Sequence, residues 1–410
     1  MGKTNTISGL DIGSGSVRAI IAEEIDVKDS ESSEFQVLGV GEAFSSGLRK
    51  GVVVDIDETV SAIHKAIEKA ERASGSSLGR VFLSIEGSHI STHISKGTVV
   101  ISKADGEVSE DDMNRAIESS QALSLPPNRE VLKVIPQSFS IDGEDSIKYP
   151  VGMSGVRLEV ETLIVEASTP AIKNIYKCLE KAEVEVEGLV LAPMAAAYSS
   201  LDKKQKELGV ALVDIGAGTT GLCVYEEGSI IHVAIIPVGG NHITNDIAIG
   251  LRSSIELAEK VKLKYGSALL DGSLKQSVID FSKIDSTEEG SVSRYKVSEI
   301  IEARLSEIFS LVNKELKSID REKLLPAGVV LTGGASKTSN ISGLAKKVLE
   351  LPARVGHPGK LQGMTKDLEG EEYSTLIGLV IAGSMERDGG GGGMRDTSLK
   401  LKEFFRKFLP

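Results

Sequence analysis

The chain has 410 residues, of which 40% are hydrophobic and 26% are charged, and its formal net charge is -12. This length allows two large domains, whereas the acidic balance argues against a nucleic-acid partner, because neutralising phosphates needs a basic surface. Cys178 and Cys223 fall inside predicted regular elements and indicate neither a disulfide framework nor a thiolate metal site. The chain lacks both an apolar leader and a run of about 18 apolar residues, so we expect a cytoplasmic protein that does not span a membrane.

The first half begins with a pattern typical of an α/β domain. Residues 7–24 predict two alternating apolar strands around a tight glycine turn, and residues 35–44 predict a third strand. A helix is expected over about 57–73, with Asp57 or Thr59 as its cap.

After a strand at 81–86, the pattern changes to alternating strands around one helix. This change, from about 87 to 161, predicts an inserted α+β subdomain. Regular α/β order is expected to resume with a strand at 163–168 and a helix at 171–183, and the half closes with a short helix at 194–201.

The opening pattern returns without a gap in the second half. The residues that recur 203 positions later are Asp11, Gly13, Gly15 and the pair Glu23 and Glu24, which correspond to Asp214, Gly216, Gly218 and the pair Glu226 and Glu227. The period is too long for a solenoid. The repeat therefore predicts two related domains that face each other across a cleft.

The second half continues with helices. One helical stretch is expected from about 243 to 265, a long helix from 297 to 319, and a helix from 374 to 385 after a buried strand and glycine turn near 329–335. The run of glycines at 389–393 predicts a flexible linker.

The two glycine turns predict a phosphate site. Glycine lets backbone N–H groups approach a phosphate chain without a Cβ in the way, and two facing copies would grip the β and γ phosphates of ATP from opposite sides. The expected phosphate-binding residues are Asp11, Gly13, Ser14, Gly15, Ser16, Asp214, Gly216, Ala217, Gly218, Thr219 and Thr220. Asp11 and Asp214 would order the water shell of Mg2+. The pattern from Gly216 to Gly221 continues as a strand, which argues against a Rossmann site, and the chain has no P-loop motif.

Together with Gly333, Gly334 and Ala335, these turns resemble the phosphate and adenosine motifs of the actin, sugar-kinase and heat-shock-chaperone superfamily. The order is the expected one, and the resemblance covers nearly the whole chain. It implies that the turn at Gly333 packs on the nucleoside and that Glu259 and Lys262, which match a Glu-x-x-Lys pattern, reach the purine and ribose. An ordinary solvated helix face is the alternative for these two residues.

Within this superfamily the chain resembles the bacterial FtsA cell-division family, because the extra subdomain follows the fourth strand and a glycine linker precedes an amphipathic C-terminus. That resemblance implies a protein at the division site on the cytoplasmic face of the membrane, which binds MgATP, self-associates into short filaments and links the polymer FtsZ to the membrane with other divisome proteins. It also implies that the FtsZ C-terminal tail docks on 239–304 and that self-assembly uses the inserted subdomain.

The C-terminal segment is predicted to bind anionic lipids. Its apolar stripe at helical spacing and its basic flanks suit an interfacial helix. The residues are Leu401, Phe404, Phe405, Phe408, Leu409, Lys400, Lys402, Arg406 and Lys407. Docking on its own domain or on a partner groove is the alternative.

These expectations combine into one domain plan for a duplicated superfold with an insert and a terminal helix. The predicted segments are 1–86 and 165–200 for the first actin-like domain, 87–164 for the insert, 201–238 and 305–387 for the second domain, 239–304 for its small subdomain, 388–394 for the linker and 395–410 for the membrane helix.

Turnover is expected to be very slow. Relatives in the superfamily carry a water-orienting glutamate where this chain has Ala192, so nucleotide would act mainly as an assembly ligand. Two alternatives are a small-molecule kinase of the same superfold and the related type IV pilus assembly protein. His89 and His93 are read as solvated strand residues, and the acidic run from Glu107 to Asp112 as a helix N-terminus.

Overall fold

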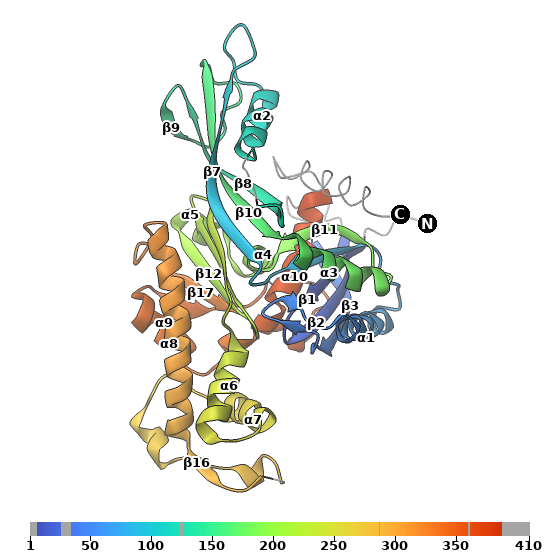
Figure 1. Ribbon diagram of the computed structural model, residues 1–410, viewed down its shortest axis with the longest axis vertical. Coiled ribbons are helices and arrows are strands. Elements are labelled where there is room, and N and C mark those ends of the chain that lie inside the picture. The colour runs from blue at the N-terminus through green and yellow to red at the C-terminus, as the bar shows by residue number, and fades with distance from the viewer. Residues whose placement is uncertain (1–5, 26–33, 123–125, 287, 360, 388–410) are drawn as a thin grey trace.

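Two five-stranded sheets lie at the centre of the computed structural model, which describes residues 6–25, 34–122, 126–286, 288–359 and 361–387 (Figure 1). The strands of the first sheet, in spatial order, are β11 (Val186–Leu191), β6 (Val81–Ile85), β1 (Thr6–Ile12), β2 (Ser16–Ile25) and β3 (Glu34–Phe44). Those of the second are β14 (Ser229–Ile236), β13 (Thr220–Glu226), β12 (Val210–Ile215), β17 (Val329–Thr332) and β18 (Ala353–Val355).

The two sheets have the same topology. In each, the first three strands pair antiparallel in succession, and the fourth and fifth add in parallel on the other side of the first strand. Four of the seven residues of β1 and all six residues of β12 are buried, which suits strands covered on both faces. This shared topology confirms the predicted duplication into two related domains.

Helices cover both sheets. In chain order they are α1 (Ile56–Ser74), α3 (Thr169–Lys181), α4 (Ala192–Ser200), α5 (Lys203–Leu208), α6 (Gly240–Leu251), α7 (Ile255–Tyr265), α8 (Arg294–Ser318), α9 (Ile341–Leu349) and α10 (Ser374–Arg387). Although it comes last, α10 packs on β1 and β6 of the first sheet. α4 and α10 pack against each other, and neighbouring elements bury most residues of both helices. A helix that is buried on nearly every side needs apolar or small residues all round, as these two have. Among the described residues, no helix combines the length and apolar character that a bilayer crossing requires.

Two helix predictions need correction. Asp55 caps α1, since its Oδ1 accepts a hydrogen bond from the Glu58 N–H at 3.0 Å; neither Asp57 nor Thr59 does so. The helical stretch expected over 243–265 is two helices, because Arg252 adopts a left-handed conformation at φ 55° and ends α6.

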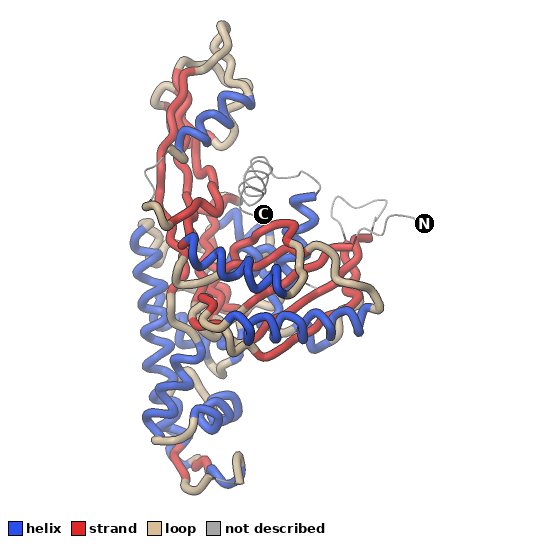
Figure 2. Tube along the Cα trace, turned by 45° about the vertical axis from the view of Figure 1, so that its right-hand side comes forward, coloured by secondary structure: helices blue, strands red, loops and turns tan. Residues whose placement is uncertain are grey.

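Outside the insert, the remaining elements are short strands and 3-10 turns. They are β4 (Leu48–Arg49), β5 (Val52–Val53), β15 (Val278–Asp280) and β16 (Ser291–Ser293), with short 3-10 turns η1 (Gly272–Gln276), η2 (Phe281–Lys283), η3 (Gly334–Lys337), η4 (Lys366–Glu369) and η5 (Glu371–Tyr373). α8 runs from the second sheet to the small unit that carries α6, α7 and β16 (Figure 2). The expected boundary at 304 therefore falls inside one continuous helix.

The inserted subdomain is an antiparallel sheet with one helix, and it projects from the body at the top of Figure 1. Its elements are β7 (Ile90–Val100), β10 (Arg157–Ser168), β8 (Arg129–Ile141) and β9 (Glu144–Ile147), in that spatial order, and α2 (Glu110–Ser120). The strand expected at 163–168 is the end of β10, so it belongs to this sheet and not to the sheet of the first domain. Ser109 caps α2 through a capping box with Asp112, which agrees with the predicted helix N-terminus.

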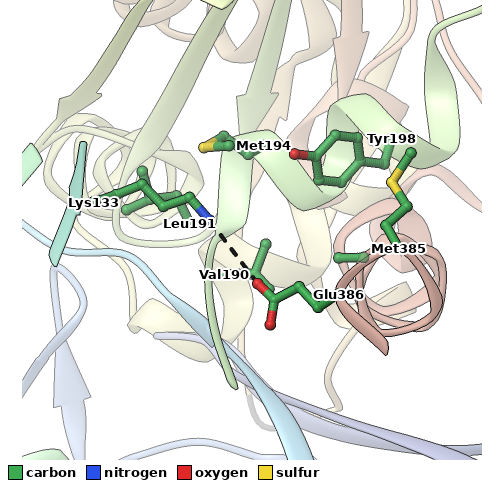
Figure 3. A pocket seen from close by; sticks show the side chains of 8 residues that line it. Lys133, Val190, Leu191, Met194, Tyr198, Met385 and Glu386 are labelled. Carbon is green, nitrogen blue, oxygen red and sulfur yellow. Dashed lines mark ion pairs between the residues drawn. The ribbon is translucent and has the colours of Figure 1, made fainter. Parts of the chain in front are cut away.

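The insert contacts both halves of the molecule. The Thr92 hydroxyl donates to the carbonyl of Val233 in β14 at 2.9 Å. On the first half, Lys133 of β8 faces Glu386 of α10 across a small pocket, with 3.9 Å between Nζ and Oε1 (Figure 3). Burial lowers the pKa of Lys133. Contacts on both sides restrain the insert relative to the body.

Candidate functional site

The two glycine turns are built alike. In the first, the Gly13 N–H donates to the Ser16 carbonyl at 3.0 Å, and in the second, the Gly216 N–H donates to the Thr219 carbonyl at 2.9 Å. Each turn connects the first two strands of its sheet, which pair antiparallel up to the turn. The same hydrogen bond at equivalent positions shows that the repeat in sequence is also a repeat in conformation.

The turns lie face to face. A Cβ added to Gly15 would come 2.8 Å from Cβ of Ala217, and one added to Gly218 would come 2.7 Å from Oγ of Ser14. Both distances are shorter than a real Cβ contact allows, so close approach requires glycine here. The structure therefore brings the residues predicted to bind phosphate in the first turn against those of the second.

The hairpin formed by β4 and β5 closes a third side of the site. The Gly51 N–H donates to Ser14 Oγ at 2.8 Å, and Cα of Lys50 lies 3.1 Å from where a Cβ on Gly218 would be. The charge of Lys50 also acts on the ring of His242 at the start of α6, whose pKa is lowered mainly by burial. Sequence reasoning missed Lys50, for which the only local signal was a Lys-Gly pair in a short connection.

Two aspartates stand at the ends of equivalent strands. The Ser84 hydroxyl donates to Asp11 Oδ1 at 2.5 Å, and the Thr375 hydroxyl donates to Asp214 Oδ2 at 3.0 Å. Burial raises the pKa of Asp11, and burial with the nearby charge of Asp11 raises that of Asp214 to about 6. Both carboxyls are therefore held in place by a hydroxyl while their charges repel one another.

Sequence reasoning also missed a third carboxyl, that of Glu86, which directly follows β6. Burial, and then the charge of Asp214, raise the pKa of Glu86 to about 8, while a hydrogen bond with the Thr219 side chain acts in the opposite direction. Its Oε1 atom is buried without a hydrogen-bond partner among the described residues. A single glutamate after a strand belongs to no sequence motif, so sequence reasoning could not single out Glu86.

This concentration of acidic groups suits a cation held through water. Arg18 lies beside Asp11, but its guanidinium is already paired with Glu42 at 2.7 Å. Within the described ranges, no three His, Cys, Asp or Glu side chains converge closely enough to ligate a metal directly. The residues therefore fit a hydrated divalent cation and do not form a closed protein cage.

The predicted adenosine turn borders the same site. Gly333 has φ 84°, and a Cβ there would lie 2.2 Å from Asp214 Oδ1, so both conformation and space require glycine. A Cβ on Gly334 would meet nothing within 4 Å, which indicates open space above the turn. Ala335 lies against Gly240, with 3.4 Å between its Cβ and an ideal Cβ on that glycine.

Glu259 and Lys262 meet next to this turn. They form an ion pair at 2.7 Å, and Thr244 of α6 hydrogen-bonds to both side chains. The Lys262 ammonium also donates to the Gly240 carbonyl at 3.3 Å, and the Gly240 N–H donates to Gly216 at 2.9 Å. The pair is therefore linked to the second glycine turn and is not an ordinary solvated helix face.

Other predicted residues lie elsewhere. The expectation that His89 is solvated was wrong: its side chain is buried, whereas His93 lies along β7 and is partly exposed. Ala192 begins α4 and is also buried. The linker and every predicted membrane-binding residue from Lys400 to Leu409 lie outside the described residues.

Comparisons with known proteins give a consistent result. The family model "Cell division protein FtsA" matches residues 211–378, and the model "SHS2 domain inserted in FTSA" matches residues 87–166. The chain is 38% identical to the cell division protein FtsA of Pseudomonas aeruginosa, over 94% of this chain and 90% of that protein. It is 37% identical to that of Bacillus subtilis, over 90% and 82%, and 34% identical to that of Escherichia coli K12, over 92% and 90%.

Solved structures support the fold. The chain resembles a structure titled "PilM-PilN type IV pilus biogenesis complex" with a TM-score of 0.66 and 16% identity, over 92% of this chain and 98% of that one. It resembles MreB5 of Spiroplasma citri bound to ADP with a TM-score of 0.54 and 14% identity, over 94% and 97%. At these identities the likeness concerns the actin-like fold alone.

Proposed function

The chain belongs to the FtsA family of cell division proteins, and from this premise we propose that it is a membrane-tethered, ATP-binding protein that self-assembles and anchors the FtsZ ring at the division site. The observation that carries the proposal is the pair of facing glycine turns, in which Gly218 lies against Ser14. Such a pair offers backbone N–H groups to a phosphate chain from two sides.

ATP is the ligand that this arrangement suits. Its β and γ phosphates would lie at Gly13–Ser16 and Gly216–Thr220, and its nucleoside would lie over Gly334, where the turn faces open space. Lys262, Glu259 and Ala335 stand beside that turn. An MreB5 structure of the same fold was solved with ADP, which supports a nucleotide as the class of ligand.

Mg2+ is proposed as the cation of the site. Asp11 and Asp214 would hold its water shell, because each carboxyl is fixed by one hydroxyl and keeps an oxygen for a water ligand. The ion would supply charge neutralisation for the phosphates. Without it, the buried carboxyls would repel the anionic ligand.

The tail is proposed to hold the protein on anionic lipids of the cytoplasmic face. Its three phenylalanines, Phe404, Phe405 and Phe408, stand among basic residues, a composition that favours the interface of an anionic leaflet. Each basic side chain near such a surface contributes about 1 kcal/mol.

Exposed apolar side chains in two units support partner binding. In the small subdomain proposed to receive the FtsZ tail, Ile249 and Leu263 are 77% and 72% exposed. In the insert proposed to mediate self-assembly, Val100 and Val156 are 67% and 69% exposed. These side chains would lose contact with water when a partner covers them, which would favour binding.

The test is recruitment of FtsZ to anionic liposomes with MgATP present. The full chain should pellet with the liposomes and bring FtsZ with it. A chain ending at Asp388, and a chain with Phe404→Glu and Phe408→Glu, should keep nucleotide binding but leave FtsZ in the supernatant. Equal pelleting, or equal solubility, of all three chains would contradict the tether and would reopen the kinase alternative, which phosphorylation of candidate sugars would then address.

A further inference from the structure

Glu86 is the acidic residue of the site that the proposed function leaves without a role. Its Oε1 atom is buried and has no hydrogen-bond partner among the described residues. A buried carboxyl oxygen without a partner is unfavourable for folding. Such an atom is expected to serve a ligand or an ordered water that occupies the space beside it.

The backbone around Glu86 is fixed by the hairpin that closes the site. A Cβ on Gly51 would come 2.4 Å from the Glu86 carbonyl oxygen, and the Ser88 N–H donates to the Lys50 carbonyl at 3.0 Å. Gly51 in turn donates its N–H to Ser14 of the first glycine turn. The backbone of Glu86 is therefore packed against the β4–β5 hairpin, which contacts the first glycine turn through Gly51 and Ser14.

The side chain of Glu86 faces the second half of the site. The charges of Asp214 and Asp11 act on it, and Thr219 of the second glycine turn hydrogen-bonds to it. Its neighbours are thus one of the two turns proposed to hold the β and γ phosphates and the two aspartates proposed to hold the cation shell. The oxygen without a partner therefore belongs to a side chain that neighbours the groups proposed to bind the phosphates and the cation.

We propose that Glu86 orients the water molecule that attacks the terminal phosphate, so that this chain hydrolyses ATP. The inference rests on the proposed binding of ATP. It places the water-orienting group after β6, on a different element from α4, where Ala192 is buried and apolar. Glu86 is a catalytic residue in this scheme, because its carboxyl touches the attacking water.

The reaction needs orientation more than proton removal. Phosphoryl transfer passes through a loose transition state, so the protein contributes mainly position and charge stabilisation. The water oxygen bonds to the terminal phosphorus while the bond from phosphorus to the bridging oxygen breaks. ATP4- and water give ADP3- and H2PO4-, so both water hydrogens remain on the phosphate product and no other reactant is required.

The experiment compares the full chain with Glu86→Gln and Glu130→Gln. Glutamine keeps the shape of the side chain and an oxygen that can accept from Thr219. Glu130 on β8 is the matched control, since its Oε1 is also buried without a partner among the described residues but lies in the insert. The measurements are ATP affinity at equilibrium, release of phosphate in a single turnover with excess protein, and the melting temperature.

The expected result is a drop of at least tenfold in the single-turnover rate for Glu86→Gln, with ATP affinity within threefold of the wild type and no change for Glu130→Gln. If Glu86 had only a structural role, Glu86→Gln would lower the melting temperature or the ATP affinity, but bound ATP would be hydrolysed at an unchanged rate. A wild-type chain that binds ATP but hydrolyses it no faster than buffer, or at a rate independent of Glu86, overturns this inference alone. A wild-type chain that does not bind ATP overturns the proposed function as well.

Discussion

The Ser14 hydroxyl lies directly against Gly218, because a Cβ built on that glycine would come 2.7 Å from Ser14 Oγ. The two residues belong to equivalent turns in the two halves of the chain, and their contact reports how closely those halves approach. The same Ser14 oxygen accepts a hydrogen bond from Gly51 at 2.8 Å. Three separate segments therefore converge on one hydroxyl at the centre of the site.

Gly218→Val should abolish tight ATP binding. A branched side chain at this position must separate the turns or displace Ser14, which removes backbone contacts from the phosphates. We expect ATP affinity to fall at least 30-fold, which corresponds to about 2 kcal/mol, in a titration with a fluorescent ATP analogue. Gly272→Ala is the control, since a Cβ there meets nothing within 4 Å. Unchanged affinity in Gly218→Val would show that the turns do not hold the nucleotide.

Asp214→Asn should uncouple ATP binding from Mg2+. The amide keeps the shape of the side chain and a bond to Thr375 but loses the charge that orders the cation shell. We expect ATP affinity in Mg2+ to fall about tenfold, a loss of about 1.4 kcal/mol, with no loss in EDTA, where one repelling carboxylate has been removed. Asp145→Asn on exposed β9 is the control. An equal loss with and without Mg2+ would mean that Asp214 acts on the nucleotide or the fold.

Leu263→Glu should weaken binding of an FtsZ C-terminal peptide. Leu263 is 72% exposed on α7, and a charge at an apolar docking surface is left poorly solvated when the peptide covers it. The expected loss is about tenfold in fluorescence anisotropy. Leu324→Glu is the matched control, because Leu324 is 63% exposed but lies outside the small subdomain. Equal losses in both variants would argue that the peptide does not bind near α7.

The duplication was predictable because it repeats both a motif and a strand pattern. The course of β10, in contrast, could not be predicted from the sequence. Its first residues, from Arg157, alternate between exposed and buried positions, whereas its last residues, Leu163 to Ala167, are all buried. One strand therefore passes from a half-exposed sheet into the junction with the body, and its two parts look like separate elements in sequence.

The candidate site divides in the same way. Asp11, Asp214 and the glycines stand in a local pattern that occurs twice, so a role in binding phosphate and a cation could be predicted for them from the sequence. Lys50 and Glu86 have no such pattern. They reach the site only because Gly51 packs against the Glu86 carbonyl, a contact between segments far apart in sequence. Tertiary packing, and not local spacing, determines their place.

His89 is a further residue whose environment the sequence concealed. The start of β7 lies against the body, and both ring nitrogens of His89 are buried without a partner among the described residues. Burial, with the charge of Arg129, lowers the pKa of His89 to about 4. The unfolded chain binds this proton near pH 6.5 and the native protein does not, so stability is retained above pH 6.5 and falls as the pH is lowered towards 4.

His89→Phe should therefore remove part of the acid sensitivity of the fold. Between pH 7 and pH 5, we expect the wild type to lose about 2 kcal/mol more of its free energy of unfolding than the variant loses, since each pH unit below 6.5 corresponds to about 1.4 kcal/mol. Urea unfolding at the two pH values measures this difference, and other groups cancel in the comparison. His64→Gln, an exposed histidine on α1, should match the wild type. If His89→Phe and the wild type lost stability equally on acidification, the His89 ring would have to take up its proton in the folded protein as readily as in the unfolded chain.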